Sequence, residues 1–390
     1  MSRQKKLMFV LGTRPEAIKL APLILLANAD TRFQTCLVSS GQHEEMLTPI
    51  LSLFQLKADY DLKVMRADQD LATLNARICN EMVKPLLAEK PDWTIVQGDT
   101  VTCAGAATSA FLLRCPVAHV EAGLRTHNLQ APWPEEFNRR LTALTADVHF
   151  APTSEARENL RQEKIEESKI HITGNTGIDA LMLTLSMLKS RKDLQEQVAK
   201  TLSRLNSERQ LMLVTVHRRE AYGEPLKGIL RAILKIVESR PNLEVILPVH
   251  KNPNVRRAVT EILGPHASWD GSGKQRIHLF EPLDYLSFLA VMDRSSIILT
   301  DSGGVQEEAP SLQKPVLVLR ETTERDEAVK AGCAMLVGFD GEKIVNNALD
   351  LIDSSEARTR MFAKGNPFGD GKACQRILDI LYQTASRPVG

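Results

Sequence analysis

Residues 7–26, LMFVLGTRPEAIKLAPLILL, contain the first strand and the first helix that the sequence predicts. The uninterrupted apolar run 7–11 is typical of a strand that is buried on both faces. The chain then turns at Gly12, and Pro15 suits the first turn of a helix because its fixed φ matches helical geometry. The apolar side chains that follow have helical spacing, at Ile18, Ala21, Leu25 and Leu26. This segment therefore predicts a buried strand that leads directly into a helix.

The same alternation of strand and helix continues along the chain. Further strands are predicted at 36–38, 60–65, 93–97, 116–120, 148–151 and 170–172, and, after a linker at 174–177, at 211–216, 245–249, 277–279, 297–300 and 316–319. Strands that alternate with helices predict parallel sheets covered by helices on both faces. We therefore predict an α/β fold of two Rossmann-like, doubly wound domains with a cleft between them. The N-terminal domain is expected at 1–173 with a last helix within 373–390, and the C-terminal domain at 174–372.

The overall charge limits the class of partner. The chain of 390 residues carries 49 basic and 48 acidic side chains, which gives a net charge of +1. Nucleic-acid-binding proteins usually have a strong basic excess, so this balance argues against a nucleic-acid partner, although it allows a small anionic substrate. No apolar stretch approaches the roughly 20 residues that a transmembrane helix needs. Six cysteines without CxxC spacing indicate reduced thiols, and we expect a soluble, cytoplasmic protein.

Charged and glycine-rich residues gather where the predicted strands end. Ligands of open parallel sheets bind at the carboxyl ends of the strands, so these positions are the first place to look for a site. One such end could be an ordinary polar loop, but six in one chain favour a shared polar site. They are 12–14, 98–99 and 121–125 in the first half, and 217–219, 250–251 and 301–304 in the second half.

The second half contains a candidate phosphate site. Ser302, Gly303 and Gly304 follow a predicted strand and open a helix. Glycines let a ligand approach the backbone, and the free N–H groups and dipole of a helix start attract phosphate. The alternative is an ordinary helix cap. Glu307 or Glu308, on the next turns, could accept hydrogen bonds from ribose hydroxyls or simply stabilise the helix dipole.

Asp99, Glu121 and Glu135 form a group of acids in the first half that could handle protons. Glu135 lies at a predicted helix start, where it could instead stabilise the dipole. Pairs four residues apart could join the acids at 135 and 136 to the arginines at 139 and 140. His217 is the histidine best placed for acid–base chemistry, with a capping role as the alternative. No complete GxGxxG, GxxxxGK[ST] or HExxH motif occurs, so the sequence predicts no NAD, no P-loop and no metal.

Six short strings occur in a fixed order: GTRPE at 12–16, GDT at 98–100, EAGLRT at 121–126, PEExNR at 134–139, HRRE at 217–220 and TDSGGVQEE at 300–308. Together they resemble the non-hydrolysing UDP-N-acetylglucosamine 2-epimerases. The resemblance implies a GT-B arrangement in which the last helix crosses back onto the first domain. It also implies a homodimer without metal or NAD that interconverts UDP-N-acetylglucosamine and UDP-N-acetylmannosamine for polysaccharide synthesis.

The resemblance also implies roles for individual residues. The catalytic set would be Asp99, Glu121, Glu135 and His217. The substrate-binding set would be Arg14, Lys19, Phe288, Ser302, Gly303, Gly304, Glu308 and Arg325. A second, activating UDP-sugar site would involve Gln42, His43 and His250. Leu283 stands where some relatives carry a glutamine near the uracil.

The expected reaction follows from the chemistry of the sugar. No carbonyl acidifies the hydrogen at C2 and no NAD is expected, so we predict elimination of UDP to a glucal, followed by re-addition with protonation from the opposite face. The rival hypotheses are a GT-B glycosyltransferase, an epimerase for a UDP-diacetamido-uronic acid, and a nucleotide-sugar sensor without catalysis. A hydrolysing relative is disfavoured by Pro15 and Glu16 in the opening string.

Overall fold

The computed structural model describes residues 3–269 and 275–385, which form two compact units. The first unit contains the chain up to Met182 and again from Gly369, and the second contains Leu183–Phe368. The sequence predicted the first division earlier in the chain, at 173/174, and the second division later, at 372/373. Asp179 accounts for part of the difference, because its carboxylate accepts hydrogen bonds from the N–H groups of Ala373 (3.2 Å) and Cys374 (2.9 Å) and so ties this stretch to the first unit. The predicted last helix extends to 390, and its residues 386–390 lie outside the described ranges.

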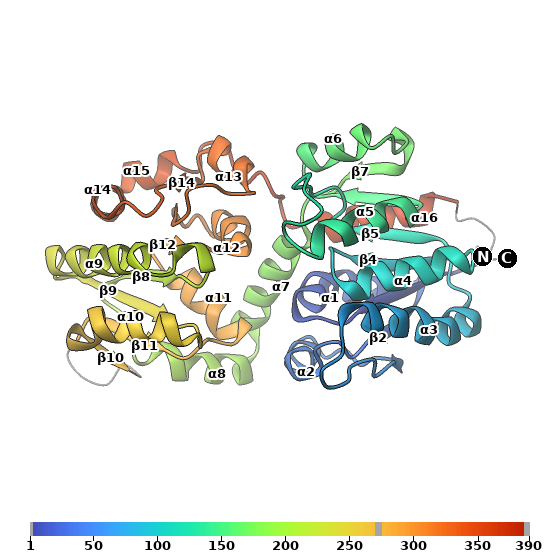
Figure 1. The fold of residues 1–390 in the computed structure, drawn as a ribbon, viewed down its shortest axis with the longest axis horizontal. Helices are drawn as coiled ribbons and strands as arrows, with labels where there is room; N and C mark the ends of the chain where they lie inside the picture. The colour runs from blue at the N-terminus through green and yellow to red at the C-terminus, as the bar shows by residue number, and fades with distance from the viewer. Residues whose placement is uncertain (1–2, 270–274, 386–390) are drawn as a thin grey trace. The chain divides into compact units, whose positions relative to one another are not determined.

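In the first unit, seven parallel strands form one sheet, and helices alternate with these strands along the chain (Figure 1). Its strands are β1 (Lys5–Leu11), β2 (Phe33–Ser39), β3 (Tyr60–Asp61), β4 (Trp93–Gln97), β5 (Val117–Val120), β6 (Val148–Ala151) and β7 (Ile170–Ile172). Its helices are α1 (Arg14–Ala29), α2 (Glu44–Leu53), α3 (Leu71–Glu89), α4 (Val101–Leu112), α5 (Glu135–Thr145), α6 (Ser154–Gln162) and the terminal α16 (Ala373–Gln383). The strand order is β3-β2-β1-β4-β5-β6-β7. The sheet therefore grows in one direction up to β3 and in the other from β4 onward.

Helix α7 (Thr176–Ser190) contains the division between the units, and the second unit repeats the same architecture. Its strands are β8 (Gln210–Thr215), β9 (Leu243–Pro248), β10 (Ala267–Trp269), β11 (Ile277–Phe280), β12 (Ile297–Thr300), β13 (Val316–Val318) and β14 (Ala334–Leu336). Its helices are α8 (Lys192–Leu202), α9 (Glu224–Ser239), α10 (Pro253–Leu263), α11 (Tyr285–Arg294), α12 (Gly303–Glu308), α13 (Asp326–Ala331), α14 (Gly341–Asp353) and α15 (Ser355–Arg360). The strand order is β10-β11-β9-β8-β12-β13-β14.

Each sheet has one point at which the strand order reverses direction. In the first unit this switch point lies between β1 and β4, and in the second between β8 and β12. The loops that follow the two strands at a switch point run to opposite faces of the sheet, which leaves a crevice at their carboxyl ends. Ligand-binding residues are therefore expected in the loops that follow β1, β4, β8 and β12.

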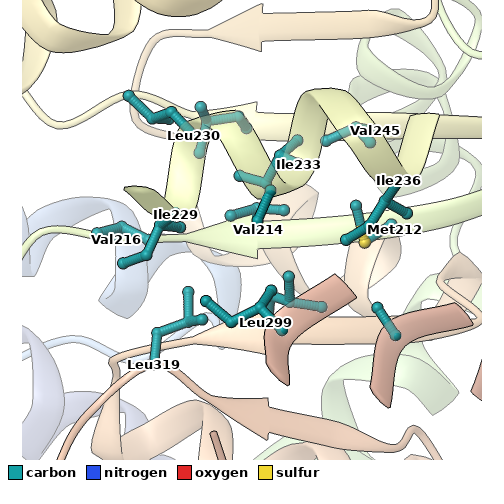
Figure 2. Close-up of a cluster of buried hydrophobic side chains, with 14 of the residues drawn as sticks. Met212, Val214, Val216, Ile229, Leu230, Ile233, Ile236, Val245, Leu299 and Leu319 are labelled. Carbon is teal, nitrogen blue, oxygen red and sulfur yellow. The ribbon is translucent and has the colours of Figure 1, made fainter. Parts of the chain in front are cut away.

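The core of the second unit shows why these segments fold as they do. Apolar residues of α9 recur three and four positions apart and form one apolar face. Strand β8 is a continuous apolar run that is buried on both sides of the sheet, and every second side chain points to the same side. Figure 2 shows these faces in contact, with Ile229, Ile233 and Ile236 from the helix and Met212, Val214 and Val216 from the strand. All six side chains are almost completely inaccessible to solvent. This packing fixes β8 in the sheet and thereby sets where the loop after it begins.

The predicted fold class of two doubly wound α/β domains is confirmed. The strands at 93–97, 148–151, 170–172 and 297–300 have the predicted bounds. The strand predicted at 60–65 was too long, since β3 ends at Asp61 and Lys63 has a left-handed φ of 50°, which a strand does not tolerate. The edge strands β10 and β14 were not predicted, because their sequences ASW and AML contain no β-branched residue, whereas the predicted strand at 170–172 contains two isoleucines.

The described residues contain neither a membrane-spanning helix nor a metal-binding group of side chains. No helix among residues 3–269 and 275–385 has both the length and the apolar character to cross a membrane. The same ranges hold no group of three or more histidine, cysteine or acidic side chains that could bind a metal ion. That the reaction needs no metal or NAD stays a prediction.

Candidate active site

Glu16 joins the two loops at the switch point of the first unit. Its side chain is fully buried, and Oε2 accepts hydrogen bonds from the N–H of Gly12 (3.0 Å) and from the N–H (2.7 Å) and hydroxyl (2.8 Å) of Thr13. Oε1 accepts a hydrogen bond from the hydroxyl of Thr100 at 2.6 Å. That hydroxyl in turn accepts from the N–H of Cys103 and caps α4. One carboxylate therefore fixes the ends of both β1 and β4.

The environment of Glu16 changes its acidity. Burial raises the pKa of this carboxyl to about 7, although the hydrogen bonds from Thr100, Thr13 and the Gly12 N–H lower it in part. Nearby, the buried His119 places Nε2 2.8 Å from the carbonyl oxygen of Gly98. A carbonyl only accepts, so Nε2 carries the proton. Burial lowers the pKa of His119 to about 4, which keeps the ring neutral at pH 7.

Asp99 follows β4 and is held by residues of α5. Oδ2 of Asp99 lies 2.7 Å from Nη2 of Arg139 and accepts a hydrogen bond from its Nε at 2.9 Å. The amide of Asn138 donates to the backbone carbonyl of Asp99 at 2.9 Å. Because the side chain of Asp99 is still 29% exposed, its carboxylate is both anchored and accessible.

Glu121 follows β5, the strand next to β4, and has a left-handed φ of 63°. Its Oε2 forms an ion pair with the ammonium of Lys19, which reaches it from α1. The amide of Gln97, at the end of β4, donates to the same oxygen at 3.1 Å. The structure thus brings together two of the predicted site residues, and Lys19 lies against a predicted catalytic acid.

Glu135 and Glu136 occupy different environments at the start of α5. Oε2 of Glu135 is buried and has no hydrogen-bond partner among the described residues. Glu136 is fully buried and accepts hydrogen bonds from the N–H groups of Thr126 (3.0 Å) and His127 (3.2 Å), so it holds the loop before α5. The structural role therefore suits Glu136, and the catalytic role of Glu135 stays a prediction.

The ion pairs predicted four residues apart on α5 are wrong. Arg139 pairs with Glu136, three residues before it, at 3.3 Å, and with Asp99 on another loop. Arg140 pairs with Glu163 at 3.2 Å. Burial does not explain this choice, because Asp99 is 29% and Glu163 20% exposed whereas Glu136 is fully buried. Glu136 instead accepts hydrogen bonds from the N–H groups of Thr126 and His127.

Three further predicted residues surround the loop after β1. Arg14 is the first residue of α1 and is half-buried. The N–H of His43 donates to the carbonyl of Gly12 at 2.9 Å, and the side-chain oxygen of Gln42 accepts from the hydroxyl of Thr102 at 2.7 Å. The proposed second-site residues of this unit therefore lie beside the Glu16 cluster.

Asp301 has the corresponding position at the switch point of the second unit. It follows β12, is fully buried, and accepts hydrogen bonds from the N–H groups of His217 and Arg218, which follow β8, at 2.7 Å each. The hydroxyls of Thr215 and Thr300 also bridge these two strands, 2.6 Å apart. The ring of His217 stacks on that of His250 with centroids 6.0 Å apart, so a predicted catalytic residue and a predicted second-site residue lie together.

The glycine-rich segment after Asp301 begins a shorter helix than expected. Helix α12 has six residues and continues as a turn of 3₁₀ helix, Ala309–Leu312. The guanidinium of Arg325 covers Gly303, where an added Cβ would lie 3.2 Å from its Cζ, and Nε donates to Glu307 at 2.7 Å. An added Cβ at Gly304 would meet no atom within 4 Å. The predicted binding residues Ser302, Gly303, Gly304 and Arg325 are thus adjacent.

Two predicted residues of the second unit are less tightly connected to this group. Glu308 is half-buried on the last turn of α12, and Phe288 is half-buried on α11. Among the described residues, no hydrogen bond, ion pair or ring contact joins Phe288 to Ser302, Gly303, Gly304 or Arg325. Their roles stay predictions.

Sequence reasoning missed the residues that support the site. Glu16 had a readable signal, because Thr13 and Glu16 have the S/T-x-x-E spacing of a capping box. Asp301 was quoted within a string but given no role. Arg139 and Asp99 lie 40 residues apart in the sequence, so local spacing does not indicate their ion pair.

Comparisons with known proteins agree on one family. A family model described as UDP-N-acetylglucosamine 2-epimerase matches residues 26–382. The Salmonella typhimurium protein of that name is 45% identical over 377 residues, covering 96% of this chain and 98% of its own. The solved structure of the Neisseria meningitidis UDP-GlcNAc 2-epimerase bound to UDP-GlcNAc is 44% identical, with a TM-score of 0.85, and covers 97% of this chain and 100% of its own. The Methanocaldococcus jannaschii enzyme in complex with UDP-GlcNAc and UDP is 35% identical, with a TM-score of 0.76 and the same coverage. These likenesses confirm the predicted GT-B fold class.

Replacing Glu16 with glutamine should change how stability depends on pH. A folded-state pKa near 7, against 4.5 for the ordinary group, means that the folded protein keeps a proton which the unfolded chain loses. The contribution of Glu16 to stability therefore falls as the pH rises from 4.5 to 7, by up to about 3 kcal/mol. Urea unfolding of the wild type and of Glu16→Gln across this range should show their difference shrinking with rising pH.

The comparison must use the difference between variants because His119, with its lowered pKa, contributes a slope of the opposite sign between about pH 4 and 6.5. The exposed Glu45→Gln is the matched control and should give a constant difference. A constant difference for Glu16→Gln as well would show that its pKa is not raised.

Proposed function

The chain belongs to the UDP-N-acetylglucosamine 2-epimerase family, and we propose that it interconverts UDP-N-acetylglucosamine and UDP-N-acetylmannosamine by inverting C2 of the sugar. The observation that carries this proposal is the pair of acids at neighbouring strand ends. Asp99 and Glu121 follow β4 and β5, and each is held by a cation, Arg139 or Lys19. Inversion at carbon needs a base on one face and an acid on the other, and this edge of the first unit supplies several carboxyl groups.

We propose that the reaction proceeds through elimination. A carboxylate removes the C2 proton, the C1–C2 double bond forms, and the bond from C1 to the diphosphate oxygen breaks, which releases UDP and a 2-acetamidoglucal. In the second half, UDP adds back to C1 while C2 accepts a proton from the other face. The two halves are mirror steps, so the enzyme needs no net proton or oxidant.

Three acids of the first unit are available for these proton transfers. The side chain of Asp99 is 29% exposed and that of Glu121 is 10% exposed, and Arg139 and Lys19 complement their charge. Glu135, with a buried oxygen that makes no hydrogen bond within the described chain, is the third.

The second unit would bind the nucleotide. Ser302, Gly303 and Gly304 offer backbone N–H groups, and we propose that they bind the diphosphate together with Arg325 and His217. Arg14 stays a predicted contact to the substrate. Negative charge grows on UDP as it departs, so donors aimed at it stabilise the transition state. Each donor could contribute about 3 kcal/mol, or about a hundredfold in rate. Phe288 and Glu308 are proposed contacts to the nucleoside, and Gln42, His43 and His250 to an activating UDP-sugar.

We also propose that the enzyme is a homodimer that uses the C-terminal turns of α3, α4 and α5. These helices contact one another in sequence, α3 with α4 and α4 with α5 (Figure 1). Four large apolar side chains near their C-terminal ends are exposed: Leu87, Phe111, Leu112 and Leu144. Leu112 is 73% and Leu144 76% exposed, and burial of such large apolar side chains against a second copy would favour association.

Incubation with UDP-N-acetylglucosamine in heavy water tests the reaction directly. Elimination exchanges the C2 hydrogen with solvent, so proton NMR should show the mannosamine epimer carrying deuterium at C2, with free UDP and glucal accumulating slowly. Retention of the original hydrogen would contradict elimination. No epimer without an added acceptor would favour a glycosyltransferase.

Asp99→Asn separates proton handling from nucleotide binding. The variant should lose most of its turnover while its affinity for UDP changes little, because Asp99 lies on the first unit and the nucleotide is assigned to the second. Equal losses in both would indicate that Asp99 binds substrate only.

Leu112→Asp and Leu144→Asp should convert the dimer to a monomer, since each places a charge in a buried apolar interface. Light scattering after size-exclusion chromatography measures the mass. Leu26→Asp, at a leucine that is 40% exposed on α1, is the matched control and should stay dimeric. A monomeric wild type would contradict the proposal.

A further inference from the structure

Asp301 makes two kinds of contact with one residue. Its Oδ2 accepts hydrogen bonds from the N–H groups of His217 and Arg218, and its Oδ1 lies 2.9 Å from Nδ1 of the His217 ring. The ring contact has the distance of an ion pair, although Oδ1 lacks an aligned hydrogen bond among the described residues. The carboxylate is completely buried, whereas the ring is 43% exposed. A buried anion is therefore fixed behind an accessible imidazole.

The backbone contacts set the position of the loop. The backbone of His217 is held on both sides. Its N–H donates a hydrogen bond to Asp301, and its carbonyl accepts one from the hydroxyl of Tyr222 at 3.1 Å. Hydrogen bonds to an ionised acceptor are about twice as strong as neutral ones. The origin of the His217 side chain is thus fixed relative to β12.

The ring contact sets the protonation pattern of the imidazole. An ionised carboxylate only accepts, so the nitrogen that faces Asp301 must carry a proton, and in the neutral ring Nε2 then holds the lone pair. Stacking on the ring of His250, at an interplanar angle of 23°, restricts rotation. His250 itself accepts a hydrogen bond at Nδ1 from the N–H of Asn252, which fixes the second ring.

The ionised form of Asp301 is consistent with its surroundings. Burial by itself raises the pKa of this carboxyl, but the contact with the His217 ring and the N–H groups of Arg218 and His217 outweigh it, and the net pKa is lowered. The anion therefore persists at neutral pH.

We propose that Asp301 is a positioning residue that holds His217 with its Nδ1 proton toward the protein interior and directs Nε2 to the diphosphate. This inference rests on the proposed function, in which UDP departs from the sugar. In the imidazolium form, Nε2–H donates to an oxygen of the departing diphosphate while Asp301 balances the charge of the ring. No proton has to leave the ring in this arrangement.

The first test is the tautomer of His217, which needs no substrate. In ¹⁵N-labelled protein, the neutral His217 ring should be protonated at Nδ1 in the wild type and at Nε2 in Asp301→Asn, because the asparagine amide donates where the carboxylate accepted. The signal is assigned by its loss in His217→Gln among the nine histidines. A wild-type ring protonated at Nε2, or a tautomer unchanged in Asp301→Asn, would overturn the proposal.

The second test is a double-mutant cycle. Asp301→Asn should lower kcat about a hundredfold or more with little change in KM; the equivalent change in a Ser-His-Asp triad lowers kcat about ten-thousandfold. In the His217→Gln background the same substitution should cost less than about threefold, because its effect passes through the ring. Additive losses would show that Asp301 acts only on the loop.

Tyr222→Phe is the matched control, since it removes a hydrogen bond to the His217 backbone but keeps the carboxylate. It should keep the tautomer and most of kcat. A loss in Tyr222→Phe as large as in Asp301→Asn would contradict the proposal. If the wild type shows the Nδ1–H tautomer but no epimerase activity, the proposed function fails while the ring geometry stands.

Discussion

A buried carboxylate holds the two loops at the switch point of each sheet, and the rest of the site depends on it. Glu16 does so between the ends of β1 and β4, and Asp301 between the ends of β8 and β12. The residues that follow β1 and β8 have backbone N–H groups that no neighbouring strand binds, and a buried N–H without a partner is costly. A carboxylate with two acceptor oxygens meets this need and links segments far apart in sequence. The loops that carry the predicted chemistry are thus built on buried carboxyl groups.

The two anchors differ in what they present to a ligand. Glu16 contacts hydroxyls and N–H groups only, so it shapes the loops that bear Arg14 and Asp99. Asp301 also reaches a titratable ring, that of His217. The first unit in addition holds acids paired to cations on helices, as in Asp99 with Arg139. A division of labour follows from these local environments, with proton transfer proposed for the first unit and anion binding for the second.

The fold could be predicted largely from the sequence, because buried parallel strands are continuous apolar runs and polar residues mark their ends. The segments 98–99, 121–125 and 301–304, which were predicted to follow strands, do follow β4, β5 and β12, and the site proposed here is built on them. The supporting contacts could not be predicted. Helix spacing suggested partners for Arg139 on its own helix, but its main partner lies 40 residues away, and only the packing of α5 on α4 brings them together. Short edge strands such as β10 and β14 were missed because their position is set by neighbours rather than by their own pattern.

Amide hydrogen exchange of the wild-type protein tests the central claim most directly. Four backbone N–H groups donate hydrogen bonds to a buried carboxyl group. Those of Gly12 and Thr13 donate to Glu16, and those of His217 and Arg218 donate to Asp301. Such bonds contribute about 1.5–3 kcal/mol, so these four amides should exchange about a hundredfold slower than in an unstructured peptide. Exchange of all four at the rate of an unstructured peptide would contradict the account.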